Sequence, residues 1–168
     1  MRTRIMTSAH VRRTLDRLAH EIVERNRGAG NLVIMGILKS GAEVAGAVVD
    51  FIGRIESVEP PCVDLDVTPF RDDRESGEGE AVDLPDLTDR DVVLVDDVLF
   101  TGRTVRAALD ALVRAGRPRS IQLLVLVDRG HREYPIQPDY VGRVLPTKHE
   151  ERVEVLLEDG GMAVDVVE

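Results

Sequence analysis

The sequence has 168 residues, of which 43% are hydrophobic and 32% charged, so we expect one globular domain spanning residues 1–168. A formal net charge of −9 argues on its face against a protein built mainly to bind nucleic acid. Because it has one cysteine (Cys62), no long apolar run and no apolar N-terminal segment, we expect no disulfide, no membrane span, no secretory signal and a cytoplasmic location.

The charge is uneven along the chain. Acidic residues concentrate in residues 72–89 and 150–168, whereas arginines gather near the N-terminus, namely Arg12, Arg13, Arg17, Arg25 and Arg27. The net charge therefore does not decide whether one face of the protein binds a polyanion.

Hydrophobic periodicity predicts helices that alternate with apolar strands. Helices are expected at residues 8–27, 41–55 and 105–115, and strands at 31–37, 62–68, 91–95, 121–127, 152–157 and 162–167. Ser8 is expected to cap the first helix and Gly28 to end it. Residues 70–85 and 128–147 lack periodicity, which predicts a mobile loop and an irregular segment. The alternation favours an α/β fold with a doubly wound, mostly parallel sheet.

The most informative stretch is Val92–Thr104, where an apolar strand, two aspartates and a polar turn precede a helix. Val92–Val95 suit a parallel strand that is covered on both faces. The helix presents an apolar stripe at Val105, Leu109, Leu112 and Val113. Asp96 and Asp97 then fall at the carboxyl end of the strand, where open α/β sheets bind their ligands.

The turn itself is typical of an anion site. Thr101, Gly102, Arg103 and Thr104 offer backbone N–H groups, two hydroxyls and a guanidinium at the start of a helix. Two adjacent carboxylates repel each other unless a cation or hydroxyl donors lie beside them. A ribose 5-phosphate would satisfy both features. The alternative is an ordinary turn whose acidic residues cap the helix.

A second turn follows the strand predicted at residues 31–37. Residues 36–41 have the glycine spacing of a nucleotide P-loop, but Ala42 and Glu43 replace its lysine and hydroxyl residue. The small-residue turn that remains, with Lys39, is predicted to cradle a second anion, and a plain strand-to-helix turn is the alternative. The histidines show no zinc-ligand spacing, and no nucleophile–base pair stands out.

Together these residues resemble the PyrR family of bifunctional pyrimidine-operon attenuation proteins and uracil phosphoribosyltransferases. The resemblance covers nearly the whole chain, in the stretches Arg17–Gly28, Asp66–Asp73, Val92–Leu112, Gly116–Ile136 and Pro138–Arg143. It implies a type I phosphoribosyltransferase fold with a small hood, and Mg²⁺-dependent conversion of uracil and phosphoribosyl pyrophosphate to UMP and pyrophosphate. It also implies a homodimer or homotetramer that binds pyrimidine-operon leader RNA in response to uridine nucleotides.

The resemblance assigns site residues as well. Asp96 and Asp97 would hold the ribose hydroxyls, directly or through Mg²⁺, and Arg71 would belong to a flexible loop that closes over the reaction. The other substrate-binding residues implied are Lys39, Ser40 and Gly41 for pyrophosphate, Val98, Thr101, Gly102, Arg103 and Thr104 around the ribose phosphate, and Val127 and Asp128 beside uracil. A hood around Arg143–Leu145 would complete the frame of the base.

For RNA, the resemblance implies the residues Arg13, Arg17, His20, Arg129, Arg132, Arg143 and Lys148. Several positions depart from the family pattern. Asp16 replaces a threonine and Gln137 an arginine, Lys148 and His149 replace Ser-Lys, and Phe100 stands where the family has tyrosine. The Leu38–Gly41 turn lacks the arginine of the usual Lys-Thr-Arg-Gly loop and shifts its lysine. An added carboxylate opposes RNA binding, and loss of an arginine removes bidentate phosphate contact. A UMP-responsive RNA-binding regulator with little catalysis is therefore one alternative function.

The position of Phe100 bears on the choice of base. Enzymes for 6-oxopurines resemble this motif but carry an acid there, which acts on the purine ring nitrogen. A phenylalanine cannot exchange a proton, so a purine acceptor is disfavoured. A purine phosphoribosyltransferase nevertheless remains the second alternative because of the Leu38–Gly41 turn.

Overall fold

The computed structural model describes residues 1–72 and 83–168. Its centre is a five-stranded sheet in the order β3-β2-β4-β5-β6, and every neighbouring pair of strands is parallel. The strands are β2 (Leu32–Ile37), β3 (Cys62–Leu65), β4 (Asp91–Leu99), β5 (Ser120–Asp128) and β6 (Tyr140–Val144).

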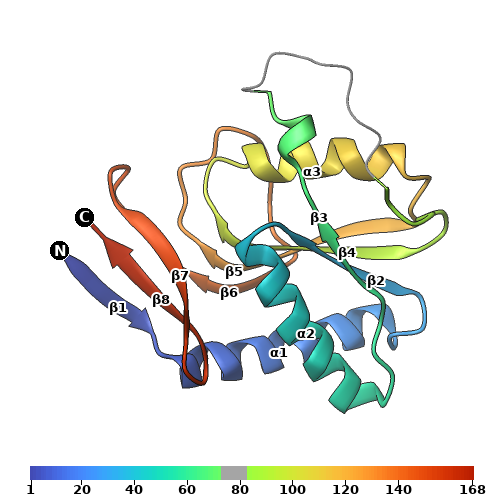
Figure 1. The fold of residues 1–168 in the computed structure, drawn as a ribbon, viewed down its shortest axis with the longest axis horizontal. Helices are drawn as coiled ribbons and strands as arrows, with labels where there is room; N and C mark the ends of the chain where they lie inside the picture. Colours follow the sequence, from blue (N-terminus) through green and yellow to red (C-terminus); the bar gives the residue numbers. More distant parts are fainter. Residues whose placement is uncertain (73–82) are drawn as a thin grey trace.

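Helices cover both faces of this sheet, as Figure 1 shows. Helices α1 (Ser8–Asn26) and α2 (Ser40–Glu56) lie on one face, and α3 (Arg103–Arg114) lies on the other. The predicted α/β, doubly wound arrangement is therefore confirmed.

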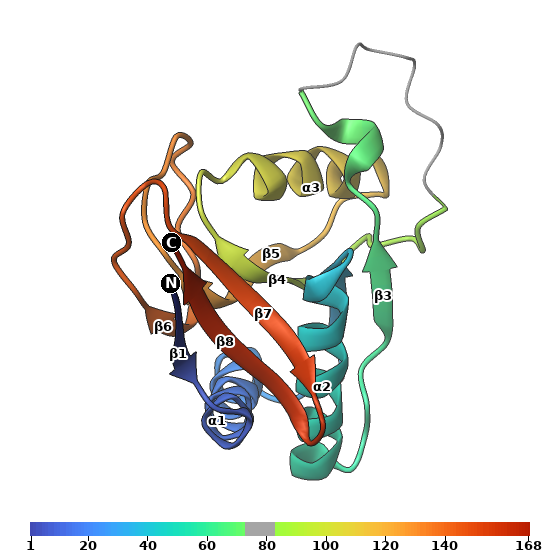
Figure 2. The same ribbon diagram turned by 60° about the vertical axis from the view of Figure 1, so that its left-hand side comes forward.

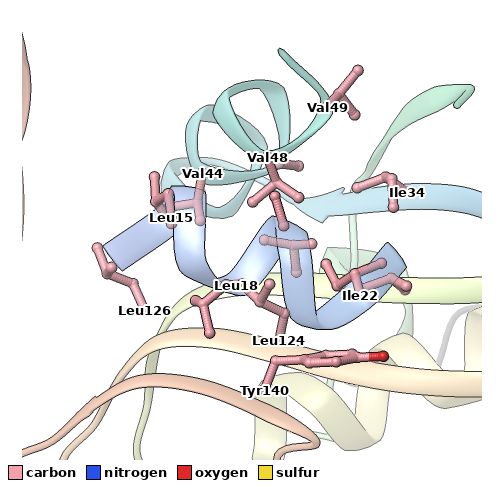
Figure 3. Close-up of a cluster of buried hydrophobic side chains, with 14 of the residues drawn as sticks. Leu15, Leu18, Ile22, Ile34, Val44, Val48, Val49, Leu124, Leu126 and Tyr140 are labelled. Carbon is pink, nitrogen blue, oxygen red and sulfur yellow. The ribbon is translucent and has the colours of Figure 1, made fainter. Parts of the chain in front are cut away.

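The core between the sheet and the first two helices consists of large aliphatic side chains (Figure 3). Leu15, Leu18 and Ile22 recur at helical spacing along α1, so one face of the helix is buried against the sheet. They meet Val48 of α2 and Leu124 of β5 in one buried cluster. The first helix therefore packs through the stripe that its sequence predicts.

The core on the α3 side uses smaller residues. Val105 and Leu112 are buried as predicted, but Val113 is 61% exposed, so its assignment to the buried stripe was wrong. Ala108 and Ala111 fill the contact instead. Small side chains let the helix lie close to the sheet, and apolar periodicity based on large residues overlooks them.

A second sheet joins the two ends of the chain. Strands β1 (Arg2–Met6), β8 (Gly161–Val167) and β7 (Arg152–Glu158) form an antiparallel sheet in that order, called here the hood sheet. It packs beside α1, with both termini together (Figure 2). Strand β1 was not predicted, because its partner lies at the far end of the sequence.

Arginines hold the hood sheet from one side. The Asp165 carboxylate accepts hydrogen bonds from Arg4 at 2.5 Å and from Arg2 at 3.1 Å. Burial opposes the charge of Asp165, but these two guanidiniums outweigh burial and lower its pKa. Charged residues in β1 therefore pair with a buried acid in β8 and fix the register of the two strands.

Four local predictions needed correction. Thr7, not Ser8, caps α1, since its hydroxyl accepts the N–H of His10. Strand β4 runs on to Leu99, so both site aspartates lie inside it. Residues 128–147 were predicted irregular, yet β6 lies among them. Phe70 ends a short 3-10 helix and is buried, while residues 73–82 of the predicted mobile loop lie outside the described residues.

No helix in the described ranges is both long and apolar enough to cross a membrane.

The amino end of the central sheet is held by a buried carboxylate. Asp91 at the start of β4 accepts hydrogen bonds from Arg119, from Ser120 at 2.8 Å and from Asn31 at 3.3 Å. The hydrogen bond from Arg119 contributes most to lowering the pKa of Asp91. This one side chain thus joins β2, β4 and β5.

Asp91→Asn should lower the free energy of unfolding at pH 7 by about 1–2 kcal/mol, because it removes the charge that Arg119 pairs with. A lowered pKa stabilises the fold above the ordinary pKa of an aspartate, about 3.9, and this contribution is lost as the pH falls further. Urea unfolding from pH 7 to pH 3 should show the variant and the parent converging at acid pH. The control is Asp159→Asn in the exposed β7–β8 turn, and an equal loss there would contradict the assignment.

Candidate active site at the carboxyl edge of the sheet

The site lies where the order of the sheet reverses. From β2 the chain proceeds to β3 on one side, whereas β4 leads to β5 and β6 on the other side. A crevice therefore opens between the loops that follow β2 and β4, which is where open α/β sheets bind ligands. The predicted pyrophosphate and phosphate turns are those two loops.

Two glycines let these loops approach each other. A Cβ on Gly41 would lie 2.7 Å from the carbonyl oxygen of Val95 and 3.2 Å from the Cα of Asp96. A Cβ on Gly36 would lie 2.6 Å from the Cα of Ala42. The contacts at 2.7 Å and 2.6 Å are shorter than a Cβ atom tolerates, so glycine is required at both positions. The loop after β2, where the Leu38–Lys39 peptide bond is cis, is thereby packed against the first site aspartate.

Asp96 is buried and Asp97 is partly buried. An Asp96 carboxylate oxygen accepts the N–H of Asp97 at 2.9 Å, and an Asp97 oxygen accepts the N–H of Val98 at 2.8 Å. Burial, and then the neighbouring charge of Asp97, raise the pKa of Asp96 well above its usual value. Hydroxyl donors or a cation beside Asp96 would relieve this cost.

The phosphate turn begins α3. Gly102 precedes the helix with φ +90°, a conformation that favours glycine. The Thr101 hydroxyl accepts the N–H of Arg103 at 3.2 Å, and Thr104 is exposed in the first turn of α3. The N–H groups and hydroxyls of the turn thus surround the positive end of the helix, as an anion site requires.

The Arg103 guanidinium does not extend over this turn. It donates to Glu133 at 2.7 Å, to Asp72 at 2.8 Å and to the Tyr134 hydroxyl at 3.2 Å, and it lies over the Tyr134 ring. The hydrogen bond to Glu133 contributes most to raising the pKa of Arg103. Asp72, Glu133 and Tyr134 were not singled out from sequence, because nothing local links them to Arg103.

A cavity of about 780 Å³ lies beside the phosphate turn. It is lined by Asp128, residues 130–137, Val144 and Pro146. Arg132 crosses its base: the guanidinium donates to Asp128 at 2.6 Å, to the carbonyl oxygen of Phe100 at 3.0 Å and to that of Ile136 at 2.9 Å. This cation therefore joins the end of β5, the phosphate turn and the cavity wall.

Three rings meet beside that wall. The ring centroids of Phe100, His131 and His149 lie 5.4–5.8 Å apart in edge-to-face contacts. The buried Arg129 guanidinium lies 4.0 Å from the Phe100 ring centre and donates to Thr147 at 3.0 Å. Sequence reasoning dismissed both histidines as zinc ligands and did not foresee this cluster, since its members are brought together only by the fold.

The residues predicted to bind RNA fall into two groups. Arg129 and Arg132 are bonded inside the protein, as described above. Arg13, Arg17 and His20 of α1 and Lys148 are exposed, while Arg143 is partly exposed and donates to the carbonyl oxygen of Ile5.

Of the exposed cations, those of α1 lie beside β6. Arg17 donates to the carbonyl oxygens of Val141 and Gly142, and a Cβ on Gly142 would lie 2.9 Å from Thr14, so α1 packs closely on this strand. Arg143 of β6 therefore continues the basic strip of α1. Lys148, which pairs with Glu168, lies on a separate segment after β6.

Arg143–Leu145, which the resemblance implies as a hood, lie at the end of β6 in the central sheet and not in the hood sheet. The N–H of Leu145 donates to the carbonyl oxygen of Asp128. Within the described residues, no group of three or more His, Cys, Asp or Glu side chains is arranged to hold a metal ion.

Comparison with known proteins defines the class first. The phosphoribosyl transferase domain model matches residues 3–156. Hypoxanthine phosphoribosyltransferases share the fold: the enzyme from Staphylococcus aureus has a TM-score of 0.70 at 23% identity, with 86% of this chain and 77% of the other covered. The enzyme from Trypanosoma cruzi in complex with IMP has a TM-score of 0.68 at 20% identity, with 85% and 76% covered. The chain therefore belongs to the phosphoribosyl transferase family and has its fold.

The sequence relatives are more specific. The bifunctional protein PyrR of Brevibacillus brevis is 53% identical, over 98% of this chain and 92% of its own length. PyrR of Deinococcus radiodurans is 51% identical over the same shares, and PyrR of Bacillus cereus is 51% identical over 92% and 90%. The chain belongs to the PyrR family.

Asp96→Asn should stabilise the free protein by about 1 kcal/mol at pH 7, because the amide keeps the shape of the carboxyl group without its buried charge. An acid with a raised pKa in the folded state destabilises the fold only above its ordinary pKa, about 3.9 for aspartate. The advantage of the variant should therefore be absent near pH 3, grow as the pH rises, and level off above the raised pKa. Thermal unfolding across this range measures it.

The matched control is Asp64→Asn, an exposed aspartate in strand β3, which should leave the midpoint unchanged. If Asp96→Asn unfolds earlier than the parent at pH 7, the carboxylate stabilises the fold and the account of its pKa is wrong.

Proposed function

We propose that the protein transfers a 5-phosphoribosyl group from phosphoribosyl pyrophosphate to uracil, giving UMP and pyrophosphate, and that it binds pyrimidine-operon leader RNA in response to uridine nucleotides. The observation that carries the transfer is the position of Asp96 and Asp97 near the carboxyl end of β4, shortly before the phosphate turn and at the reversal point of the sheet. Membership of the PyrR family supports both activities.

The chemistry follows from the charges that develop in the reaction. The bond from ribose C1 to pyrophosphate breaks and a bond from C1 to uracil N1 forms, while the N1 proton leaves to the pyrophosphate or to water. Positive charge therefore develops on the ribose and negative charge on pyrophosphate. The Asp96 and Asp97 carboxylates accept the ribose hydroxyls and stabilise the positive charge. The N–H groups of Thr101, Gly102 and Arg103 fix the 5-phosphate, so C1 is held at a set distance from the base.

Lys39 and the N–H groups of Ser40 and Gly41 bind the leaving pyrophosphate. Gly41 packs against Asp96, so this turn and the ribose carboxylates lie side by side. Because Ser40 has no guanidinium, Lys39 is the cation of this turn, and we assign Arg71 as a further cation for the leaving group.

Mg²⁺ fits this site as part of the substrate complex. Proteins commonly hold Mg²⁺ through one or two carboxylates, with substrate phosphates and water as the other ligands, and Asp96 and Asp97 supply two adjacent carboxylates. When bound, Mg²⁺ neutralises charge that develops on pyrophosphate.

Uracil occupies the cavity beside Val127 and Asp128. His131 lines this cavity and the Phe100 ring packs edge-to-face against it, with ring centroids 5.8 Å apart. The Phe100 ring carries no group that exchanges a proton. A purine that needs an acid at this position is therefore disfavoured, which favours the pyrimidine as acceptor.

The RNA surface is the strip of α1 and β6 that carries Arg13, Arg17, His20 and Arg143. Arg17 is anchored by the carbonyl oxygens of Val141 and Gly142, so its charge is held at a fixed place on the surface. We assign Lys148 to the edge of this surface. Arg129 holds the segment that carries Lys148, because its guanidinium donates to the carbonyl oxygens of Lys148 and His149. Arg132 is bonded to Asp128 and is not exposed on this strip. A homodimer or homotetramer remains the expected assembly.

Asp97→Asn should lower kcat/KM for phosphoribosyl pyrophosphate at least about 100-fold, as loss of a group that stabilises transition-state charge does. UMP formation from labelled uracil with Mg²⁺ measures it, and Asp64→Asn serves as the control for an exposed strand aspartate. The same assay with hypoxanthine and guanine should give no product. Product from a purine but not from uracil would favour the purine enzyme, and wild-type protein that forms neither would favour a regulator with little catalysis.

Arg17→Gln should weaken binding of pyrimidine leader RNA in the presence of UMP by about tenfold at 0.1 M salt and reduce the salt dependence by about one counterion. Gel shifts over a salt series measure both quantities. Arg54→Gln, an exposed arginine on α2 away from the strip, is the matched control. Equal affinities of the two variants would remove α1 from the RNA surface.

A further inference from the structure

Arg103 belongs to the phosphate turn, yet its side chain is already paired with anions of the protein itself. Its guanidinium donates to the Glu133 carboxylate at 2.7 Å and to the Asp72 carboxylate at 2.8 Å, from opposite directions along the chain. The Tyr134 hydroxyl donates to the same Asp72 oxygen at 3.0 Å. Two carboxylates therefore surround the one cation of the turn.

Backbone groups of the turn also form hydrogen bonds within the protein. The N–H of Arg103 is held by the Thr101 hydroxyl, and the Thr101 carbonyl oxygen accepts the N–H groups of Glu133 and Tyr134 at 2.8 and 3.0 Å. The glycine between them packs against the same segment, since a Cβ on Gly102 would lie 3.4 Å from the Cβ of Tyr134. Residues 133–134 are thus bonded directly to the turn.

These ion pairs are weak enough to exchange. The side chains of Arg103, Glu133 and Asp72 are 49%, 47% and 38% exposed, and exposed pairs contribute little to stability. A phosphate dianion accepts two parallel hydrogen bonds from a guanidinium and is favoured further by the helix N-terminus. A phosphate on the turn therefore competes well with either carboxylate.

We propose that Asp72 and Glu133 stand in for the 5-phosphate in the free protein, and that a bound phosphate takes Arg103 away from them. The inference rests on the proposed function, because it takes the turn to be the 5-phosphate site. It adds two residues that lower phosphate affinity, and it gives the arrival of the phosphate a structural consequence. Glu133 belongs to the cavity wall and Asp72 follows the proposed catalytic Arg71, so the exchange releases a contact on each side of the turn.

The variant Glu133→Gln tests whether Glu133 lowers the affinity for the phosphate. Because one of the two competing carboxylates is gone and only Asp72 remains, the variant should bind ribose 5-phosphate and UMP about three- to fivefold more tightly than the parent, as the small contribution of exposed ion pairs allows. Its affinity for uridine, which lacks the phosphate, should not change. Isothermal titration calorimetry measures all three ligands. The matched control is Glu21→Gln, which removes a carboxylate from an equally exposed arginine pair on α1.

A double-mutant cycle with Arg103→Met separates exchange from simple repulsion. If Glu133 acts by holding Arg103, its substitution has no effect once Arg103 is gone. If Glu133 only repels the phosphate through space, its effect grows in the Arg103→Met background, and the proposal is overturned. Weaker ribose 5-phosphate binding by Glu133→Gln also overturns it, since Arg103 would then be a positioning residue that Glu133 supports.

The experiment distinguishes a failure of the proposed function from a failure of this inference alone. Wild-type protein that binds neither ribose 5-phosphate nor UMP overturns the site assignment and this inference together. Wild-type binding that Glu133→Gln leaves unchanged or weakens overturns the inference alone.

Discussion

The site depends on the contact between Gly41 and strand β4. The turn after β2 can reach Asp96 only because no Cβ stands between Gly41 and the carbonyl oxygen of Val95, 2.7 Å from where that atom would be. The same contact covers Asp96 and removes it from water, and burial is the largest cause of its raised pKa. One close approach therefore joins the turns proposed to bind pyrophosphate and ribose, and it places a buried acid with a raised pKa at their junction.

Sequence was informative where the signal is local. The strand, both aspartates and the phosphate turn lie within Val92–Thr104, so an apolar run, a turn and a helix start could be interpreted together. The doubly wound, mostly parallel character of the sheet also followed from the alternation of helices and strands. Pairing between distant segments was not predictable in this way: β1 finds its partner β8 at the opposite end of the chain. Strand β6 was overlooked because prolines and glycines surround its five residues.

Side-chain roles were harder to predict than elements. Arg129 and Arg132 lie in the same polar stretch and were grouped with the exposed arginines of α1, since a sequence does not show which guanidinium is bonded internally. In the structure Arg129 lies against Phe100 and Arg132 joins Asp128 to the phosphate turn. The strip formed by Arg13, Arg17 and Arg143 remains on the surface. Most acidic residues of this chain, whose net charge is −9, lie in other segments. On the strip itself Glu21 pairs with Arg17 and Asp16 with His20, so part of its positive charge is already compensated.

The two sides of the site carry opposite electrostatic imbalances in the free protein. Asp96 is a buried carboxyl group whose nearest charged neighbour, Asp97, has the same sign, whereas Arg103 is paired with two carboxylates at once. In the proposed complex a phosphoribosyl ligand would correct both, because its hydroxyls would donate to the acids while its phosphate would accept from the turn. Relief of the repulsion at Asp96 would then contribute favourably to the binding free energy, whereas displacement of Asp72 and Glu133 would oppose binding. On this proposal, a free phosphate must displace Asp72 and Glu133 without any contact at Asp96, and a nucleoside contacts Asp96 without reaching Arg103. A ligand that carries both groups makes both sets of contacts, so it is favoured over either fragment.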